Sequence, residues 1–103
     1  MTLIGKIVGK KRVRYGQQEC HGKTEVWKNR FLIQIAHSTY RRFYLFINTV
    51  LHELLHLWLF IAMEVRHVEL SETRQHVIIY RVVAVALKEF RQAEKELRRG
   101  RTN

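Results

Sequence analysis

Apolar and polar positions follow two different periods along this chain, one typical of strands and one typical of helices. The strand-like pattern lies in the first third, where apolar residues alternate with glycine and polar residues. Because successive side chains of a strand point to opposite faces, this pattern predicts three strands, at residues 2–8, 12–15 and 27–36. In the third strand, Phe31, Ile33 and Ile35 fall on one side. Residues 9–11 are expected to form a turn and residues 16–22 a loop.

The helix-like pattern occupies the rest of the chain in two segments. The first helix is expected to begin after an N-cap at Ser38 or Thr39 and to end near Met63. After a connector at residues 64–70, the second is expected to run from an N-cap at Ser71 to a C-cap at Gly100. Together the patterns predict an α+β fold: a small N-terminal antiparallel ribbon or sheet of about three strands, followed by two long helices.

The composition limits the domain organisation and the expected compartment. A chain of 103 residues with 47% hydrophobic content can fill one modest core, so residues 1–103 are expected to form a single domain. The one cysteine, Cys20, excludes an internal disulfide and gives no sign of an oxidising compartment. The first twelve residues lack the pattern of a signal peptide. A cytoplasmic location is therefore expected.

The formal net charge of +10 favours an anionic partner such as nucleic acid, a membrane surface or an acidic peptide. No recognised nucleic-acid motif accompanies the basic clusters, so no specific nucleic-acid partner is expected. The 20 residues from Tyr44 to Met63 are apolar enough to raise a transmembrane helix. Three ionisable side chains in its middle argue against that interpretation. Contact with a membrane surface stays open.

Those three side chains are the candidate chemistry of the chain. They are His52, Glu53 and His56, which spell His-Glu-x-x-His in an otherwise apolar segment. Residues four apart share one face of a helix, so the two imidazoles can aim at one point. This is the spacing with which zinc hydrolases bind Zn²⁺ and place a carboxylate beside the metal-bound water. A buried carboxylate is costly without such a partner, which favours a metal site over a chance match. We therefore expect His52 and His56 as zinc ligands and Glu53 as the general base.

A catalytic zinc site needs a third protein ligand, and the chain contains no aspartate to provide it. Glu72 is the first candidate, because it lies 16 residues after His56, beyond a connector long enough to reverse the chain direction. Glu69 and then His67 are the next candidates. His76, one turn after Glu72, is expected to hydrogen-bond a ligand and fix its orientation. The pair Cys20 and His21 could cap a metal from outside but is more simply an ordinary part of a loop.

With these residues in place, the chain resembles the gluzincin metallopeptidases, in which the motif helix is followed by a helix bearing a glutamate ligand. An aspartate often stands four residues after that glutamate, where this chain has His76. The layout of strands and two helices is similar to the minigluzincins. The residues that match at the level of the motif are His52, Glu53, His56 and Glu72.

The resemblance implies a zinc-dependent peptidase in which a strand at residues 31–36 flanks the cleft and holds an extended peptide. It also implies a latent enzyme, with the C-terminal segment from about Arg91 onward over the cleft of its own chain or of a neighbour. No residue is identified that stabilises the oxyanion, although Tyr44, Tyr80 and Arg81 are polar groups in the right part of the sequence. The alternative is a basic nucleic-acid-binding or pseudo-enzyme protein with a structural zinc.

Overall fold

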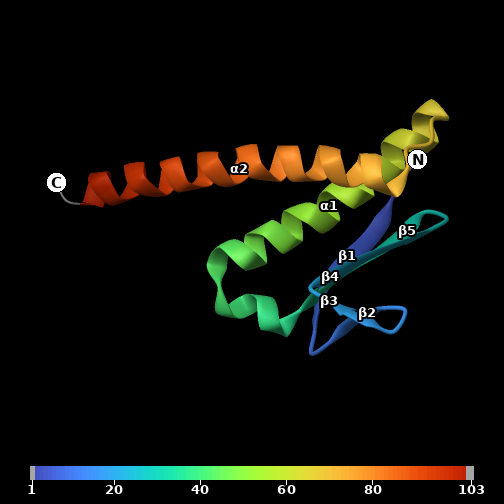
Figure 1. The fold of residues 1–103 in the computed structure, drawn as a ribbon, viewed down its shortest axis with the longest axis horizontal. Helices are drawn as coiled ribbons and strands as arrows, with labels where there is room; N and C mark the ends of the chain where they lie inside the picture. Colours follow the sequence, from blue (N-terminus) through green and yellow to red (C-terminus); the bar gives the residue numbers. More distant parts are fainter. Residues whose placement is uncertain (1, 102–103) are drawn as a thin grey trace.

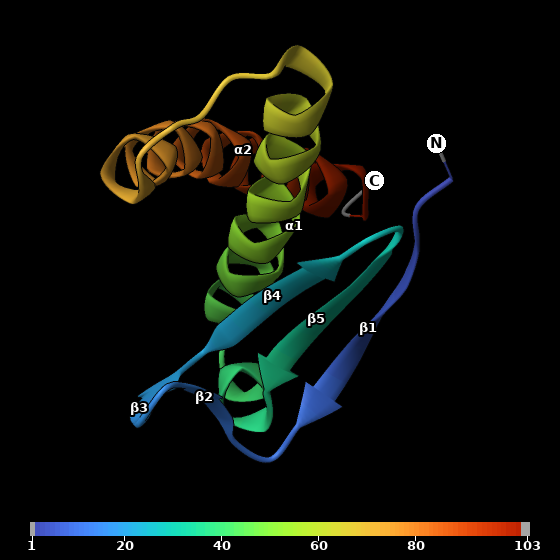
Figure 2. The same cartoon turned by 90° about the vertical axis from the view of Figure 1, so that its right-hand side faces the viewer.

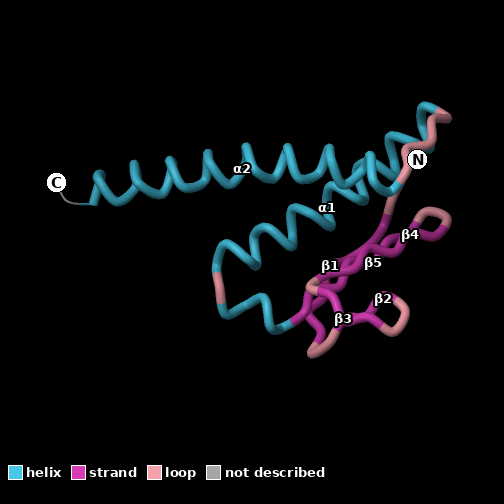
Figure 3. The backbone as a smooth tube through the Cα atoms, viewed as in Figure 1, coloured by secondary structure: helices cyan, strands magenta, loops and turns pink. Residues whose placement is uncertain are grey.

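The computed structural model describes residues 2–101 and shows a small sheet followed by two long helices, which confirms the α+β prediction (Figure 1). All strands lie at one end of the molecule, and α2 extends from there as its longest element (Figure 3). The elements are β1 (Ile4–Lys10), β2 (Val13–Tyr15), β3 (Gln18–Cys20), β4 (Gly22–Trp27), β5 (Arg30–Ala36), the 3-10 helix η1 (His37–Arg41), α1 (Phe43–Arg66) and α2 (Glu72–Arg101).

The main sheet has three strands in the order β1-β5-β4, and β2 and β3 form a separate antiparallel hairpin. The pairing of β4 with β5 is antiparallel, as predicted, but β1 runs parallel to β5. The expectation of an antiparallel sheet is therefore wrong for β1. The physical reason is that β4 turns directly into β5 and so runs against it. Between β1 and β5 the chain passes through the β2–β3 hairpin and β4, and this longer connection lets β5 run in the same direction as β1.

The sequence pattern missed two strands. Residues 16–22 were expected to form a loop, but they contain β3 and the first residue of β4. The predicted strand at residues 27–36 is in fact the end of β4, a turn and β5. Lys28 makes that turn with a left-handed backbone, at φ 53°. A lysine in this conformation carries no glycine or proline signal, which explains why the turn was not anticipated.

The helix α1 lies between the sheet and α2 (Figure 2). Toward the sheet, Leu57 packs with Ile33 and Ile35, two of the β5 side chains that the alternation placed on one side of the strand. Toward α2, Leu59 packs with Ile79 and Val83. The core thus has two parts, one on either side of α1, so the position of α1 relative to both layers is fixed by apolar burial.

The helix ends differ from the predictions in detail. Thr39 does not cap α1, because its hydroxyl donates to the carbonyl of Ala36 at 2.8 Å inside η1, and Arg42 takes the N-cap position without a side-chain bond. Ser71 does accept a hydrogen bond from the backbone N–H of Arg74, at 3.1 Å, as expected of an N-cap. The predicted C-cap at Gly100 is wrong, because α2 continues through Arg101.

Within residues 2–101, α1 is the one helix long and apolar enough to cross a membrane by length and composition. This is weak evidence by itself, because the core helix of a soluble protein passes the same test. Its two ends are nevertheless far from fully covered: Phe43 and Val65 are exposed.

Candidate metal centre

Three histidines converge between α1 and α2. His52 and His56 lie one turn apart on α1, as the motif predicts, and His76 reaches them from the first turns of α2. One ligand atom from each of the three lies within 4.8 Å of the others, an arrangement that could hold a metal ion. The apolar contact of Leu59 with Ile79 and Val83 presses the two helices together just beyond this point, which sets the distance between their histidines.

The two imidazoles of α1 point at one position. Their Nε2 atoms are 3.1 Å apart, and their rings meet nearly at right angles. Two nitrogens that each bind a tetrahedral zinc at 2.0–2.1 Å are separated by roughly 3.3 Å, so the spacing fits a shared metal. The ring of His76 lies 5.5 Å from that of His52 and 5.1 Å from that of His56. The donor set therefore fits a transition metal with imidazole ligands.

Glu53 takes a different direction from the histidines. It faces β4, where the Thr24 hydroxyl lies 2.9 Å from its Oε1 and 3.0 Å from its backbone carbonyl. The residue is only 6% exposed. Gly22 allows this closeness, because a Cβ at that position would lie 2.9 Å from the Glu53 Cγ. The carboxylate therefore has a hydroxyl donor that the sequence did not reveal, supplied by a strand that the pattern did not predict.

The cluster lines an open pocket of about 520 Å³. Glu53 and the three histidines form one part of its wall, and β4 contributes Gly22, Lys23, Thr24 and Val26. The expectation that residues 31–36 flank the cleft is wrong. They belong to β5, which is the central strand and is paired on both sides, whereas β4 is the edge strand beside the pocket.

The candidates for the third zinc ligand lie in two different pockets. Glu72 lines the histidine pocket, and its charge acts on His56, but it is not among the three residues whose ligand atoms converge. His76, expected to orient a ligand, is among them. Glu69 and His67 line a neighbouring pocket, which shares Phe60 and Met63 with the histidine pocket. The structure thus brings His52, Glu53, His56, Glu72 and His76 to one pocket.

The pocket changes the proton affinity of its ionisable groups. Burial, followed by the neighbouring His56 and His76, lowers the pKa of His52 to about 4. Burial also lowers the pKa of His56, with a further contribution from His76. These shifts favour the neutral imidazoles that a metal requires. In contrast, burial raises the pKa of the Glu53 carboxyl, although the bond from Thr24 opposes that shift.

The other residues considered from the sequence lie apart from this cluster, with two exceptions. Cys20 lines the same pocket, whereas His21 lines another one, so the two do not act as a pair. Tyr80 is close, with its ring 5.8 Å from that of His52. Tyr44 instead donates a hydrogen bond to Glu94 at 3.0 Å, away from the pocket.

The C-terminal segment does not reach the pocket. Residues 91–101 continue α2 and lead away from the histidines, and none of them lines the pocket (Figure 1). Covering of the chain's own cleft by residues 91–101 is therefore not the arrangement in this structure. Covering of the cleft by a neighbouring chain stays a prediction. Thr102 and Asn103 lie outside the described residues.

The comparisons with known proteins add no family to this description. No protein-family model, no curated protein and no solved structure gives a significant match to the chain.

Proposed function

We propose that the chain is a zinc-dependent metallopeptidase, with the zinc bound by His52, His56 and a ligand from the start of α2. The observation that carries this proposal is the convergence of three imidazoles, with an Nε2 separation of 3.1 Å, beside a buried glutamate in an open pocket. When bound, zinc would polarise the peptide carbonyl and make its water a nucleophile near neutral pH. Three protein ligands leave the fourth position free, as a catalytic rather than a structural site requires.

Glu53 is the general base in this proposal. A base is most effective when its pKa lies near the working pH, and burial shifts the pKa of Glu53 upward, in that direction. The Thr24 hydroxyl holds one carboxylate oxygen at 2.9 Å, which fixes the orientation of the group and leaves the other oxygen for the water and the leaving amine.

For the third ligand we favour His76 over Glu72, because its ring nitrogen belongs to the converging group and the Glu72 carboxylate does not. Glu72 then lines the pocket one turn earlier on α2, where its negative charge favours the protonated form of His56 and so opposes the lowering of that residue's pKa by burial. A glutamate ligand, as in the gluzincins, would require the first turn of α2 to move toward the metal.

Zinc binding to the purified chain, measured by titration calorimetry and elemental analysis, tests the site directly. We expect one zinc per chain, with loss of binding in His52→Ala and in His56→Ala. Comparison of His76→Ala with Glu72→Ala identifies the third ligand, because loss of a ligand should weaken binding at least tenfold and loss of a pocket-lining charge much less. Stoichiometric zinc in both α1 variants, with the fold intact by circular dichroism, would refute the site.

Hydrolysis of fluorogenic peptides tests the activity. Glu53→Gln should keep the zinc and the fold but lose hydrolysis, because the amide cannot accept a proton. If Glu53→Gln instead loses zinc, Glu53 is a ligand rather than the base. If the wild-type chain binds zinc and hydrolyses no peptide in any assay, the site is structural or belongs to a pseudo-enzyme.

A further inference from the structure

The side of α1 opposite the pocket carries exposed apolar residues. Leu54, Trp58 and Val65 are 38%, 57% and 67% exposed. Each lies two residues after a residue that lines the pocket, at 52, 56 and 63, and so about 200° round the helix from it. The charged rim expected on the outside of a soluble helix is therefore replaced here by an aromatic and aliphatic surface.

The helix α2 continues this surface on the same side. Val82 and Val85 are 43% and 64% exposed. They follow His76, which faces the pocket, by six and nine residues, and so point away from the pocket by about 120° or more. Since the histidines of both helices meet at the pocket, these valines lie on the same opposite side as the apolar residues of α1. We call the five residues the apolar face: Leu54, Trp58, Val65, Val82 and Val85.

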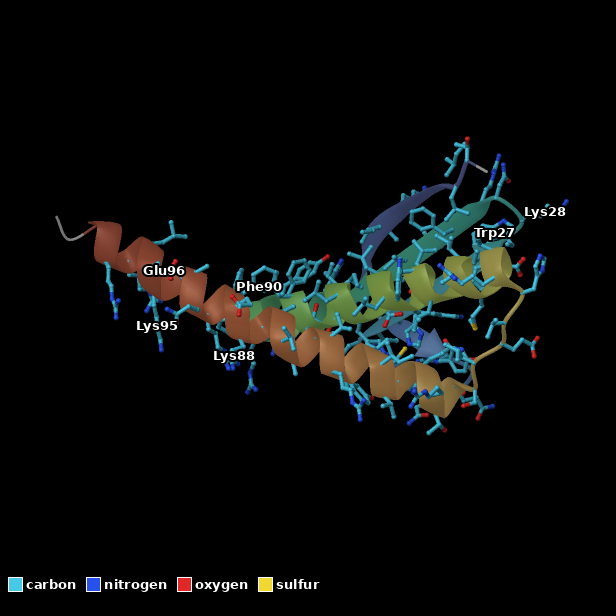
Figure 4. The ribbon with its side chains drawn as sticks, turned by 90° about the horizontal axis from the view of Figure 1, so that it is seen from above. Trp27, Lys28, Lys88, Phe90, Lys95 and Glu96 are labelled. Carbon is cyan, nitrogen blue, oxygen red and sulfur yellow. The ribbon has the colours of Figure 1, made fainter. Side chains whose placement is uncertain are left out.

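A row of cations borders the apolar face along the outside of α2. Basic residues recur every seven positions, and all are exposed: Arg74, Arg81, Lys88 and Lys95. This basic stripe lies on the side of α2 away from α1, as the labelled Lys88 and Lys95 show (Figure 4). Arg81 and Lys88 lie about 40° and 60° beyond Val85 round the helix. Within residues 2–101, none of the four is part of a described ion pair.

We propose that this side of the helix pair binds the surface of an anionic membrane, with the apolar face in the headgroup region and the basic stripe on the lipid phosphates. A surface-bound amphipathic helix has this combination of apolar residues, a tryptophan and flanking cations. The proposal does not depend on the metal centre, which lies on the other side of α1 and would remain open to water.

The charge distribution favours a membrane over the two other occupants. A second copy of this chain also carries a net charge of +10, so pairing of the two surfaces would bring like charges together. Nucleic acid would satisfy the basic stripe but would leave the apolar face against phosphates and water. Only an anionic lipid surface offers a partner to both. Glu89 ends the apolar face along α2, because it lies four residues after Val85 and seven after Val82 and so shares their side of the helix.

Tryptophan fluorescence tests the proposal with an internal control, because the chain has two tryptophans. Trp58 lies on the apolar face, and Trp27 lies at the far end of the sheet beside Lys28 (Figure 4). In Trp27→Phe, the remaining Trp58 should shift to the blue with vesicles of phosphatidylcholine and phosphatidylglycerol but not with phosphatidylcholine alone. In Trp58→Phe, the emission of Trp27 should not change. No shift in Trp27→Phe, or an equal shift in both variants, would overturn the proposal.

Vesicle sedimentation with matched variants tests the two parts of the surface. The pair Arg81→Gln and Lys88→Gln should weaken binding about tenfold or more, whereas Lys10→Gln and Lys11→Gln, which remove the same charge beside the sheet, should have a smaller effect. The pair Val82→Ser and Val85→Ser should also weaken binding about tenfold, unlike Ile4→Ser and Ile7→Ser on β1.

Three results would contradict the proposal. Equal effects of the two charge pairs would mean that only the net charge matters. Binding that resists alkaline carbonate would indicate a span rather than surface contact. Tight binding to duplex DNA or a concentration-dependent dimer, each weakened by the same variants while vesicle binding is absent, would assign the surface to that partner instead.

Discussion

The bond between Thr24 and Glu53 joins the strand layer to the motif helix at a single residue pair. The Thr24 hydroxyl is within hydrogen-bonding distance of both the carbonyl and the carboxylate of Glu53, at 3.0 and 2.9 Å. A buried carboxylate without a donor is costly, so this hydroxyl makes the position of Glu53 compatible with folding. It also opposes the rise in the pKa that burial causes, because the bond stabilises the anionic form of the carboxyl.

Thr24→Val should therefore destabilise the metal-free chain by about 1 to 3 kcal/mol at neutral pH, whereas Thr24→Ser should be close to wild type. Burial raises the pKa of Glu53, so the folded chain holds this proton more tightly than the unfolded chain does. Stability contributed by the protonated form is then lost as the pH rises toward the raised pKa. The deficit of Thr24→Val should be larger at neutral than at acid pH. Urea unfolding at both pH values measures it, and an equal deficit at both would exclude the carboxylate as its cause.

Cys20 lines the same pocket as Glu53, and its thiol responds to the charge of that carboxylate. Burial and then the charge of Glu53 raise the pKa of its thiol. Alkylation by iodoacetamide should thus require a higher pH than for a free cysteine, because the thiolate is the reactive form. In Glu53→Gln the midpoint of the pH–rate profile should move down. The experiment needs chelator-treated protein in both cases. An unchanged midpoint would show that Glu53 does not act on the thiol.

At the scale of elements, β4 determines the shape of the site, and it does so through its first residue. A Cβ on Gly22 would lie 2.9 Å from both the Glu53 Cγ and the Thr49 Cγ2. Such approaches require a neighbouring group to move. A glycine that opens an edge strand is thus needed here for the close approach of α1 and not for an unusual backbone angle.

Gly22→Ala should accordingly lower the free energy of unfolding by about 1 to 3 kcal/mol. Gly100→Ala is the matched control, because it lies in α2 with open space around it and alanine is the better helix former. That variant should be neutral or slightly stabilised. Thermal unfolding of both variants against wild type makes the comparison, and equal stability of the two would show that α1 can move away from β4 without cost.

The elements that were predictable are those whose pattern is local. The apolar run of α1, the alternation at Ile33 and Ile35 and the cap at Ser71 are each determined within a few residues of sequence, and all were found. The strand β4 was not predicted, because its first four residues are small or polar and show no alternation of apolar and polar positions. It is defined instead by its pairing with β5. The parallel pairing of β1 is likewise a contact between distant segments, which no periodicity reveals.

The candidate site divides in the same way. His52, Glu53 and His56 were identified from their spacing on one helix, which α1 reproduces. The proposed third ligand comes from α2, and which residue of α2 faces the two histidines depends on the angle and register between the helices. The sequence alone could therefore reduce the candidates only to a few residues. His76 rather than Glu72 comes nearest to the other histidines because the packing of Ile79 and Val83 on Leu59 sets that register. Neither Thr24 nor Cys20 gave any signal.

At the scale of the whole molecule, the histidine cluster and the outer half of α2 lie at different ends. The helix runs past the start of α1 (Figure 1). Tyr44 of α1 contacts its outer half at two residues. The phenol donates to Glu94 at 3.0 Å, and the Arg91 guanidinium lies 4.8 Å from the centre of the Tyr44 ring. The segment after Glu94 contributes an ion pair with Arg98, which is exposed and adds little to stability.

Two truncations separate these parts of α2 and also test latency. A chain ending at Glu96 keeps both contacts of Tyr44, so we expect wild-type zinc content and nearly wild-type stability. A chain ending at Phe90 loses both contacts and should be less stable than the chain ending at Glu96, again with one zinc per chain. Since residues 91–101 do not line the pocket, neither truncation should raise peptidase activity. Activity that increases in a truncated chain, with zinc and fold retained, would show that a C-terminal segment covers the cleft in solution, and dependence of the increase on protein concentration would show whether that segment comes from a neighbour.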